Sequence, residues 1–174
     1  MKSRLVFLDA NVIIEAHRLN IWNHLVGQFE IVIPSFILDN EVRYFTSGRG
    51  QTVAINLSGD EKAGRIKRDT ALPADFQKLY ANFKPIFVDG LDPGEKEALA
   101  LLYSGRYEEH RFCTGDGAAI RALSVLSLQF QGVSFETLMT ESGQKAKDFK
   151  RHFQDEFFKK NIAQGSTERD SLKK

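Results

Sequence analysis

The sequence has almost no cysteine and no long apolar stretch. Its 174 residues contain one cysteine, Cys113, which excludes an intramolecular disulfide framework and favours a reducing compartment. The first apolar run, residues 5–8, is too short for a signal peptide, and no run reaches the length of a membrane span. We therefore expect a cytoplasmic protein with no membrane partner.

A strong charge of either sign is also lacking. Lys and Arg number 24 against 23 Asp and Glu, which gives a formal net charge of +1. This balance neither requires nor excludes a polyanionic partner, so any nucleic-acid surface has to be a local patch. Apolar residues, in contrast, are plentiful: 42% of the chain is hydrophobic and 14 residues are phenylalanine, which is enough for the core of one domain.

Short apolar runs alternate with helical patterns along the chain. The apolar runs, each next to turn residues, are residues 5–8, 30–33, 112–114 and 133–135. Between them, apolar side chains recur at helical spacing. Strands and helices in alternation predict an α/β fold whose parallel sheet is covered by helices on both faces.

Three segments do not follow this alternation. Residues 46–73 have no clear periodicity, and we interpret them as an insertion or flap of a main domain that spans residues 1–142. Residues 143–162 predict a charged helix with phenylalanines along one side. Residues 163–174 are polar and predict a disordered tail.

Acidic residues occur where such a sheet would bring them to one cleft. Asp9 and Asp116 each follow a predicted strand, and Glu41 and Glu97 lie on predicted helices. Ligands of parallel sheets bind at the carboxyl ends of the strands, so these four side chains can meet there. Clustered carboxylates repel one another unless a divalent cation neutralises them, and their hard oxygens suit Mg²⁺ or Mn²⁺. The pattern indicates a metal-dependent phosphodiesterase site, whereas the four histidines show no ligand spacing.

The same residues fall in four motifs. Residues 5–14 are an apolar strand followed by Asp9-Ala10-Asn11 and further apolar residues, and residues 33–42 have a Pro-Ser entry with an acid six residues after the serine. Residues 94–101 carry a glutamate before alanine, and residues 113–116 end in Gly-Asp. Together these motifs resemble the PIN domain family of nucleases over about residues 4 to 140.

This resemblance implies a three-layer α/β/α sandwich with a mostly parallel central sheet. It also implies an acidic pocket that binds Mg²⁺ or Mn²⁺ and hydrolyses the phosphodiester bonds of RNA. The implied catalytic and metal-binding residues are Asp9, Glu41, Glu97 and Asp116. The residues implied to orient them are Asn11 and Thr114, and Ser35 is either a helix N-cap or a polar contact in the pocket.

The third acidic position stays open at this point. Asp92-Pro93-Gly94-Glu95 has the pattern of a helix start, with an acidic cap, a proline at the first position and a capping-box glutamate. Those structural roles for Asp92 and Glu95 leave Glu97 for the metal. Either of the two could instead replace Glu97.

Two functions from different classes compete. The leading hypothesis is a metal-dependent endoribonuclease, with the toxin of a toxin–antitoxin pair as one form of it, and with an antitoxin or a second copy of the chain as partner. The alternative is a catalytically inactive PIN-like module that binds nucleic acid or serves as a scaffold. Basic side chains that could hold phosphates, or could simply be solvated, are Arg43, Arg49, Lys62, Arg65, Lys67 and Arg68.

Overall fold

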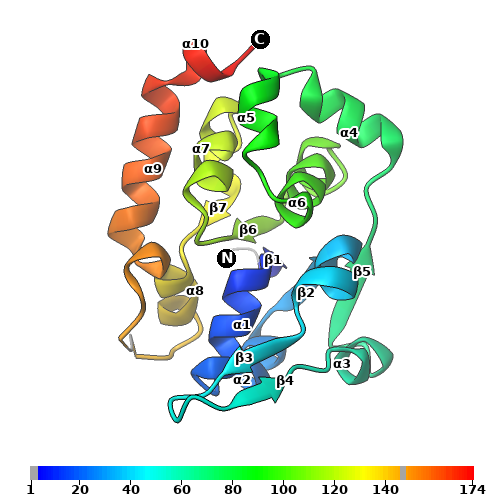
Figure 1. Ribbon diagram of the computed structural model, residues 1–174, viewed down its shortest axis with the longest axis vertical. Helices are drawn as coiled ribbons and strands as arrows, with labels where there is room; N and C mark the ends of the chain where they lie inside the picture. Colours follow the sequence, from blue (N-terminus) through cyan, green and yellow to red (C-terminus); the bar gives the residue numbers. More distant parts are fainter. Residues whose placement is uncertain (1–3, 146–147) are drawn as a thin grey trace.

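The structure, a computed structural model that describes residues 4–145 and 148–174, is an α/β fold built on a five-stranded parallel sheet (Figure 1). The strands of this sheet are β1 (Leu5–Leu8), β2 (Glu30–Pro34), β5 (Ile66–Asp69), β6 (Arg111–Cys113) and β7 (Gly132–Val133). Their order is β5-β2-β1-β6-β7, and every described pair is parallel. The chain thus adds β2 and β5 on one side of β1 and then crosses to the other side, where it adds β6 and β7.

Helices cover both faces of the sheet, which confirms the predicted three-layer α/β/α sandwich (Figure 1). One face carries α1 (Ala10–Arg18), α2 (Trp22–Gln28) and α8 (Phe135–Glu141). The other carries α4 (Pro73–Tyr80), α5 (Pro85–Asp89), α6 (Pro93–Tyr103) and α7 (Gly117–Val125). No helix within the described part of the chain is long and apolar enough to cross a membrane.

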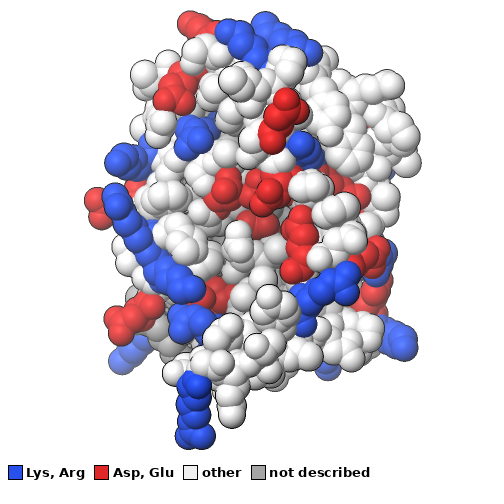
Figure 2. Space-filling view, viewed as in Figure 1, with Lys and Arg blue, Asp and Glu red and all other residues white. Residues whose placement is uncertain are grey.

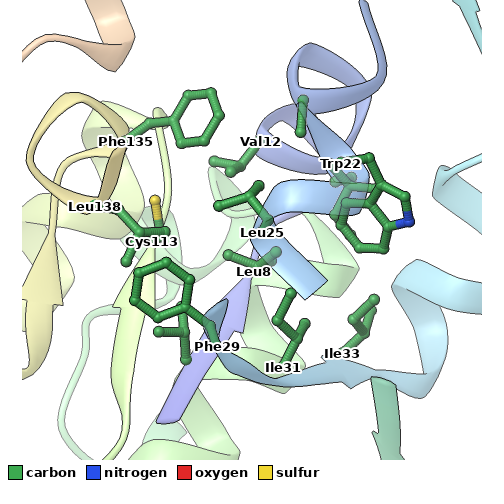
Figure 3. Packing of buried hydrophobic residues seen from close by; sticks show 14 of the residues in the cluster. Leu8, Val12, Trp22, Leu25, Phe29, Ile31, Ile33, Cys113, Phe135 and Leu138 are labelled. Carbon is green, nitrogen blue, oxygen red and sulfur yellow. The ribbon is translucent and has the colours of Figure 1, made fainter. Parts of the chain in front are cut away.

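The central strand β1 is apolar throughout because it is buried on both faces. Val6 and Leu8 point into the core beneath α1 and α2, whereas Phe7 points into the core beneath α6 and α7. Figure 3 shows Leu8 packed with Leu25 of α2 and with Ile31 of the neighbouring strand. Each such side chain stabilises the fold by roughly 1.5–3 kcal/mol when fully buried. This double burial fixes the position of the residue that follows β1.

Residues 46–73 are not one flap, which corrects part of the prediction. β3 (Tyr44–Thr46) and β4 (Thr52–Ala54) form an antiparallel hairpin outside the central sheet, and α3 (Ser58–Lys62) follows. Residues Ile66–Asp69, however, form β5 and pair with β2 as an edge strand of the central sheet. Only Ile66 of β5 is buried, so this edge strand has no apolar run by which the sequence could reveal it.

The C-terminal segment also differs from the predictions of a helix over 143–162 and a disordered tail. A 3₁₀ turn, η3 (Arg151–Phe153), precedes α9 (Asp155–Thr167) and α10 (Arg169–Leu172). The tail is ordered because α9 packs closely on α7, where a Cβ at Gly165 would lie 2.6 Å from the carbonyl oxygen of Arg121. Residues 146 and 147 of the predicted helix lie outside the described residues. The phenylalanines of this segment dock on the domain itself, with Phe149, Phe153 and Phe158 buried.

Candidate functional site

Two aspartates from distant parts of the chain meet at the carboxyl ends of β1 and β6. Asp9 follows β1, and Asp116 lies three residues after the end of β6, the parallel neighbour of β1. Thr114 connects them: its Oγ1 donates to Asp9 Oδ2 at 2.9 Å and accepts from the backbone N–H of Asp116 at 3.0 Å. The strand order reverses at this place, which is where ligands of open α/β sheets bind.

Each aspartate also begins a helix. Asp9 Oδ1 accepts from Ala10 N at 2.7 Å at the start of α1, and Asp116 Oδ1 accepts from Ala119 N at 2.9 Å at the start of α7. These N–H groups favour the ionised carboxylates, as at other helix N-termini. The second oxygen of Asp116 accepts no hydrogen bond from the described residues, and Asp9 Oδ2, which accepts from Thr114, has a second lone pair, so capping and ligand binding are compatible roles.

Asp9 is buried in a way that penalises its charge. The side chain is almost fully enclosed, and this desolvation raises the pKa of Asp9 to about 7, against the hydrogen bonds from Thr114 and Ala10. The negative charges of Glu41 and Asp116 raise the pKa of Asp9 further. Burial therefore favours the protonated carboxyl, and a cation at this place would favour its ionised form.

Glu95, on the first turn of α6, is the third acid beside the aspartates. Burial raises the pKa of Glu95 to about 9, and the charges of Asp116 and Asp9 act in the same direction. Its Oε2 accepts from Asp92 N at 3.0 Å, as the helix-start pattern predicts. Asp92 itself is exposed at the cap of α6. The capping role of Glu95 thus coexists with a position next to both aspartates.

Glu97 points elsewhere, and both of its oxygens are engaged by the backbone. Oε2 accepts from Phe36 N at 2.8 Å and Oε1 accepts from Ala71 N at 3.1 Å. These bonds tie α6 to the segment after β2 and to the segment after β5. Glu97 and Ala71 are both buried, so losing the bond between them would leave a buried N–H group unsatisfied. The structure therefore separates two glutamates that the sequence places two residues apart.

Glu41 reaches the same region from a π-helical turn, η1 (Ile37–Glu41), in which Val42 N donates to Ile37 O at 3.2 Å. Its Oε1 accepts from Gly94 N at 3.1 Å. Burial raises the pKa of Glu41, and the charges of Asp92 and Glu97 add to the shift. Figure 2 draws one face of the molecule and shows acidic side chains gathered at its centre, with most Lys and Arg side chains around its margin.

Two of the residues implied to orient the acids lie elsewhere. Ser35 does not cap a helix: its Oγ donates to Asp69 O at 2.9 Å and contacts Thr70, so it joins the ends of β2 and β5. The N–H of Phe36 is instead satisfied by Glu97. Asn11 is exposed on the first turn of α1, where no hydrogen bond to an acid is found among the described residues. Thr114 alone contacts an acid as implied.

His152 was missed by the sequence reasoning. It lies against Gly115, where an added Cβ would be 2.9 Å from His152 Cδ2. Burial and then Lys150 lower the pKa of His152, whereas Glu15 and Asp116 oppose that shift. A neutral imidazole therefore lies near Asp116 at neutral pH. The sequence carries no signal for it, because the 3₁₀ turn that presents it falls within a predicted helix.

The chemistry of these side chains suits a hard divalent cation. Carboxylate and hydroxyl oxygens are the ligands that Mg²⁺ and Mn²⁺ prefer. Within residues 4–145 and 148–174, no three His, Cys, Asp or Glu side chains already have the spacing of a metal centre. The acids lie close enough to shift one another's pKa, and three of them could hold one ion together only if they drew closer.

Comparisons of the chain with protein-family models, with curated proteins and with solved structures give no match.

Proposed function

We propose that this chain is a Mg²⁺- or Mn²⁺-dependent endoribonuclease of the PIN type. One observation carries the proposal: Asp9, Glu95 and Asp116 come from three separate elements and interact electrostatically at the strand-order reversal. No described Lys or Arg forms an ion pair with Asp9 or Glu95. Buried carboxylates without a basic partner are costly, which supports a role in binding a cation.

The roles of the residues follow from their positions. Asp9, Glu95 and Asp116 would hold the metal ion, with Glu41 at the side, and Glu95 takes the place that the resemblance gives to Glu97. When bound, the ion lowers the pKa of a water molecule and stabilises the charge that develops on the phosphate. Asp9 and Glu95 have to lose their protons for this, and Thr114 keeps Asp9 oriented by its hydrogen bond.

The test is the variant Asp116→Asn, with Asp89→Asn as a matched control on the exposed side of α5. An asparagine retains the oxygen that accepts from Ala119 N, so the fold should be retained. We expect Asp116→Asn to lose Mn²⁺-dependent cleavage of a single-stranded RNA by at least 100-fold, with an unchanged unfolding midpoint. Equal cleavage by Asp116→Asn and the wild type would rule the proposal out.

The inactive binding or scaffold module is the second candidate. It is favoured by the lack, among the described residues, of three acids already spaced for a metal. Mn²⁺ should raise the unfolding midpoint of the wild type and not that of Asp116→Asn if the site binds the ion. An antitoxin or a second copy as partner stays a prediction, and the buried Phe149, Phe153 and Phe158 do not supply a surface for either.

A further inference from the structure

A groove opens beside the acidic site. It has a volume of about 520 Å³ and lies between α1, η1 and the first strand of the β3–β4 hairpin. Glu41 lines its wall and also acts electrostatically on Asp9, so the groove borders the candidate catalytic site. A polymer that passes the acids would extend into it.

Basic side chains outnumber acidic ones along this groove. The charged residues that line it are Glu15, Arg18, Glu41, Arg43 and Lys150. Arg18 is held by Glu15 through two hydrogen bonds, of 2.8 and 2.5 Å. Lys150 is more than half exposed and lies 3.9 Å from a Glu15 oxygen that already accepts from Arg18, so its charge is only weakly compensated. The groove thus has positive charge available to phosphates.

Arg43 differs from three other members of the basic group that the sequence suggested, because each of those three pairs with a carboxylate. Its guanidinium donates to two backbone carbonyls, those of Asp39 at 3.0 Å and Asn40 at 3.4 Å, and no described carboxylate pairs with it. In contrast, Arg65 pairs with Asp60, Lys67 with Glu30, and Arg68 with Asp39 and Glu61. Arg43 is therefore the member of this group that is both in the groove and free of a carboxylate partner among the described residues.

The hairpin adds an aromatic ring. Tyr44 is 57% exposed and lines the groove, while its neighbour Phe45 anchors the strand against His17 of α1. Across the hairpin Tyr44 is paired with Ala54, whose side chain is too small to cover a ring. An exposed tyrosine next to an uncompensated arginine is the combination on which an unpaired base stacks while its phosphate is held.

We propose that this groove binds an unpaired segment of the RNA substrate, with Tyr44 as the stacking platform and Arg43 and Lys150 as phosphate contacts. The proposal rests on the proposed nuclease function for the identity of the polymer. The groove selects single strands, because the bases of a duplex present no free face to Tyr44. It also makes Tyr44 a determinant of which substrates are bound, separate from the acids that would cleave them.

Binding is measured in EDTA, where cleavage does not occur, by fluorescence anisotropy of a labelled 12-nucleotide single-stranded RNA with the full chain. Tyr44→Ala should weaken binding at least fivefold, whereas Tyr44→Phe should stay within twofold of the wild type because the ring is retained. The matched control is Phe130→Ala, which removes a ring that is 88% exposed and lies in a different pocket. Arg43→Ala should weaken binding and reduce the salt dependence of log Kd by about 0.7.

Three results would overturn the proposal: a wild type that does not bind the single strand, an unchanged affinity in Tyr44→Ala, or an RNA duplex of equal length that competes as well as the single strand. The experiment distinguishes a failure of the groove assignment from a failure of the nuclease function. If Tyr44→Ala binds as the wild type while Mn²⁺-dependent cleavage by the wild type is observed, only the groove assignment is wrong. If Tyr44→Ala loses binding and the wild type cuts no RNA, the groove assignment stands without the nuclease.

Discussion

The hydroxyl of Thr114 donates a hydrogen bond to Asp9 Oδ2 at 2.9 Å, although the two residues are 105 positions apart in the sequence. Both side chains are buried, and the bond lowers the pKa of Asp9 against the effect of desolvation. The same hydroxyl accepts from Asp116 N at 3.0 Å. One threonine therefore sets the relative position of the two aspartates at the carboxyl ends of β1 and β6.

Replacing Thr114 by valine should damage the site more than the fold. The variant keeps the shape of the side chain but leaves Asp9 Oδ2 and Asp116 N without this partner, which should cost about 1–3 kcal/mol in the free energy of unfolding. Loss of a partner that orients a metal ligand should weaken Mn²⁺ binding roughly 10–100-fold. Urea unfolding and calorimetric titration measure the two effects. Thr114→Ser, which keeps the hydroxyl, is the control, and a valine variant with wild-type Mn²⁺ affinity would contradict this role.

The two glutamates of α6 should respond in opposite ways to substitution by glutamine. Glu95→Gln replaces a carboxyl that is protonated in the metal-free protein at neutral pH, so the free energy of unfolding should change little, whereas Mn²⁺ binding should be lost because a glutamine cannot ionise. Glu97→Gln turns one of two accepting oxygens into a donor group that faces a backbone N–H. It should lose about 1–3 kcal/mol of stability and keep its Mn²⁺ affinity within threefold.

Thermal unfolding with and without Mn²⁺ distinguishes these outcomes. A Mn²⁺-induced rise of the unfolding midpoint that persists in Glu95→Gln and vanishes in Glu97→Gln would return the third acidic position to Glu97. Loss of the rise in both variants would mean that the support of α6 by Glu97 is needed for the site. Each variant serves as the control of the other, since both replace a carboxyl by an amide on the same helix.

Asp9 and Asp116 could be predicted from the sequence because each follows an apolar strand, and parallel neighbouring strands end at the same edge of the sheet. The sequence could not decide whether Glu95 or Glu97 is the third acid of the site. Helix residues that are two positions apart point in directions about 200° apart around the helix axis. Which of the two glutamates faces the aspartates therefore depends on how α6 packs against its neighbours. The partners of Glu97 are N–H groups of Phe36 and Ala71, which no local pattern connects to α6.

The same limit explains the two misread segments. The edge strand β5 is Ile66-Lys67-Arg68-Asp69, with one apolar residue, so its pairing with β2 depends on backbone bonds and surface ion pairs. The polar end of the chain is helical because Gly165 allows α9 to approach the backbone of α7 closely. Both segments are specified by distant contacts rather than by their own periodicity.

The metal-free protein should lose stability as the pH rises. The folded-state pKa of Asp9 is raised from 3.8 to about 7 and that of Glu95 from 4.5 to about 9, so the folded state holds protons that the unfolded state has released. The contribution of both groups to stability is fully present below about pH 4, and it is lost as the pH rises through about 7 for Asp9 and about 9 for Glu95. The free energy of unfolding should therefore fall continuously as the pH rises from 4 to 9.

Urea unfolding in EDTA at pH 5, 7 and 9 measures this fall, and Asp9→Asn, which has no charge to lose, should show a shallower one. Mn²⁺ should restore most of the stability at pH 9, because the ion replaces the protons. A stability that is constant over this range, or one that rises with pH, would show that these carboxyls are not protonated in the folded protein.

At Gly94, near the start of α6, there is no room for a side chain. A Cβ at this position would lie 2.5 Å from Glu41 Oε2 and 2.5 Å from Ile37 Cγ1. Gly94→Ala should therefore push Glu41 away, break its bond with Gly94 N and cost about 1–3 kcal/mol in the free energy of unfolding.

The matched control for Gly94→Ala is Gly27→Ala in α2, where nothing lies within 4 Å of the added Cβ. Alanine in that helix should stabilise the protein by about 0.5–1 kcal/mol, because the unfolded chain loses conformational freedom. Opposite signs for the two substitutions, measured by urea unfolding, are the expected result. If Gly94→Ala is as stable as Gly27→Ala and binds Mn²⁺ as the wild type does, then Glu41 does not depend on the start of α6 for its position, and its place beside the other acids has to be set by η1 alone.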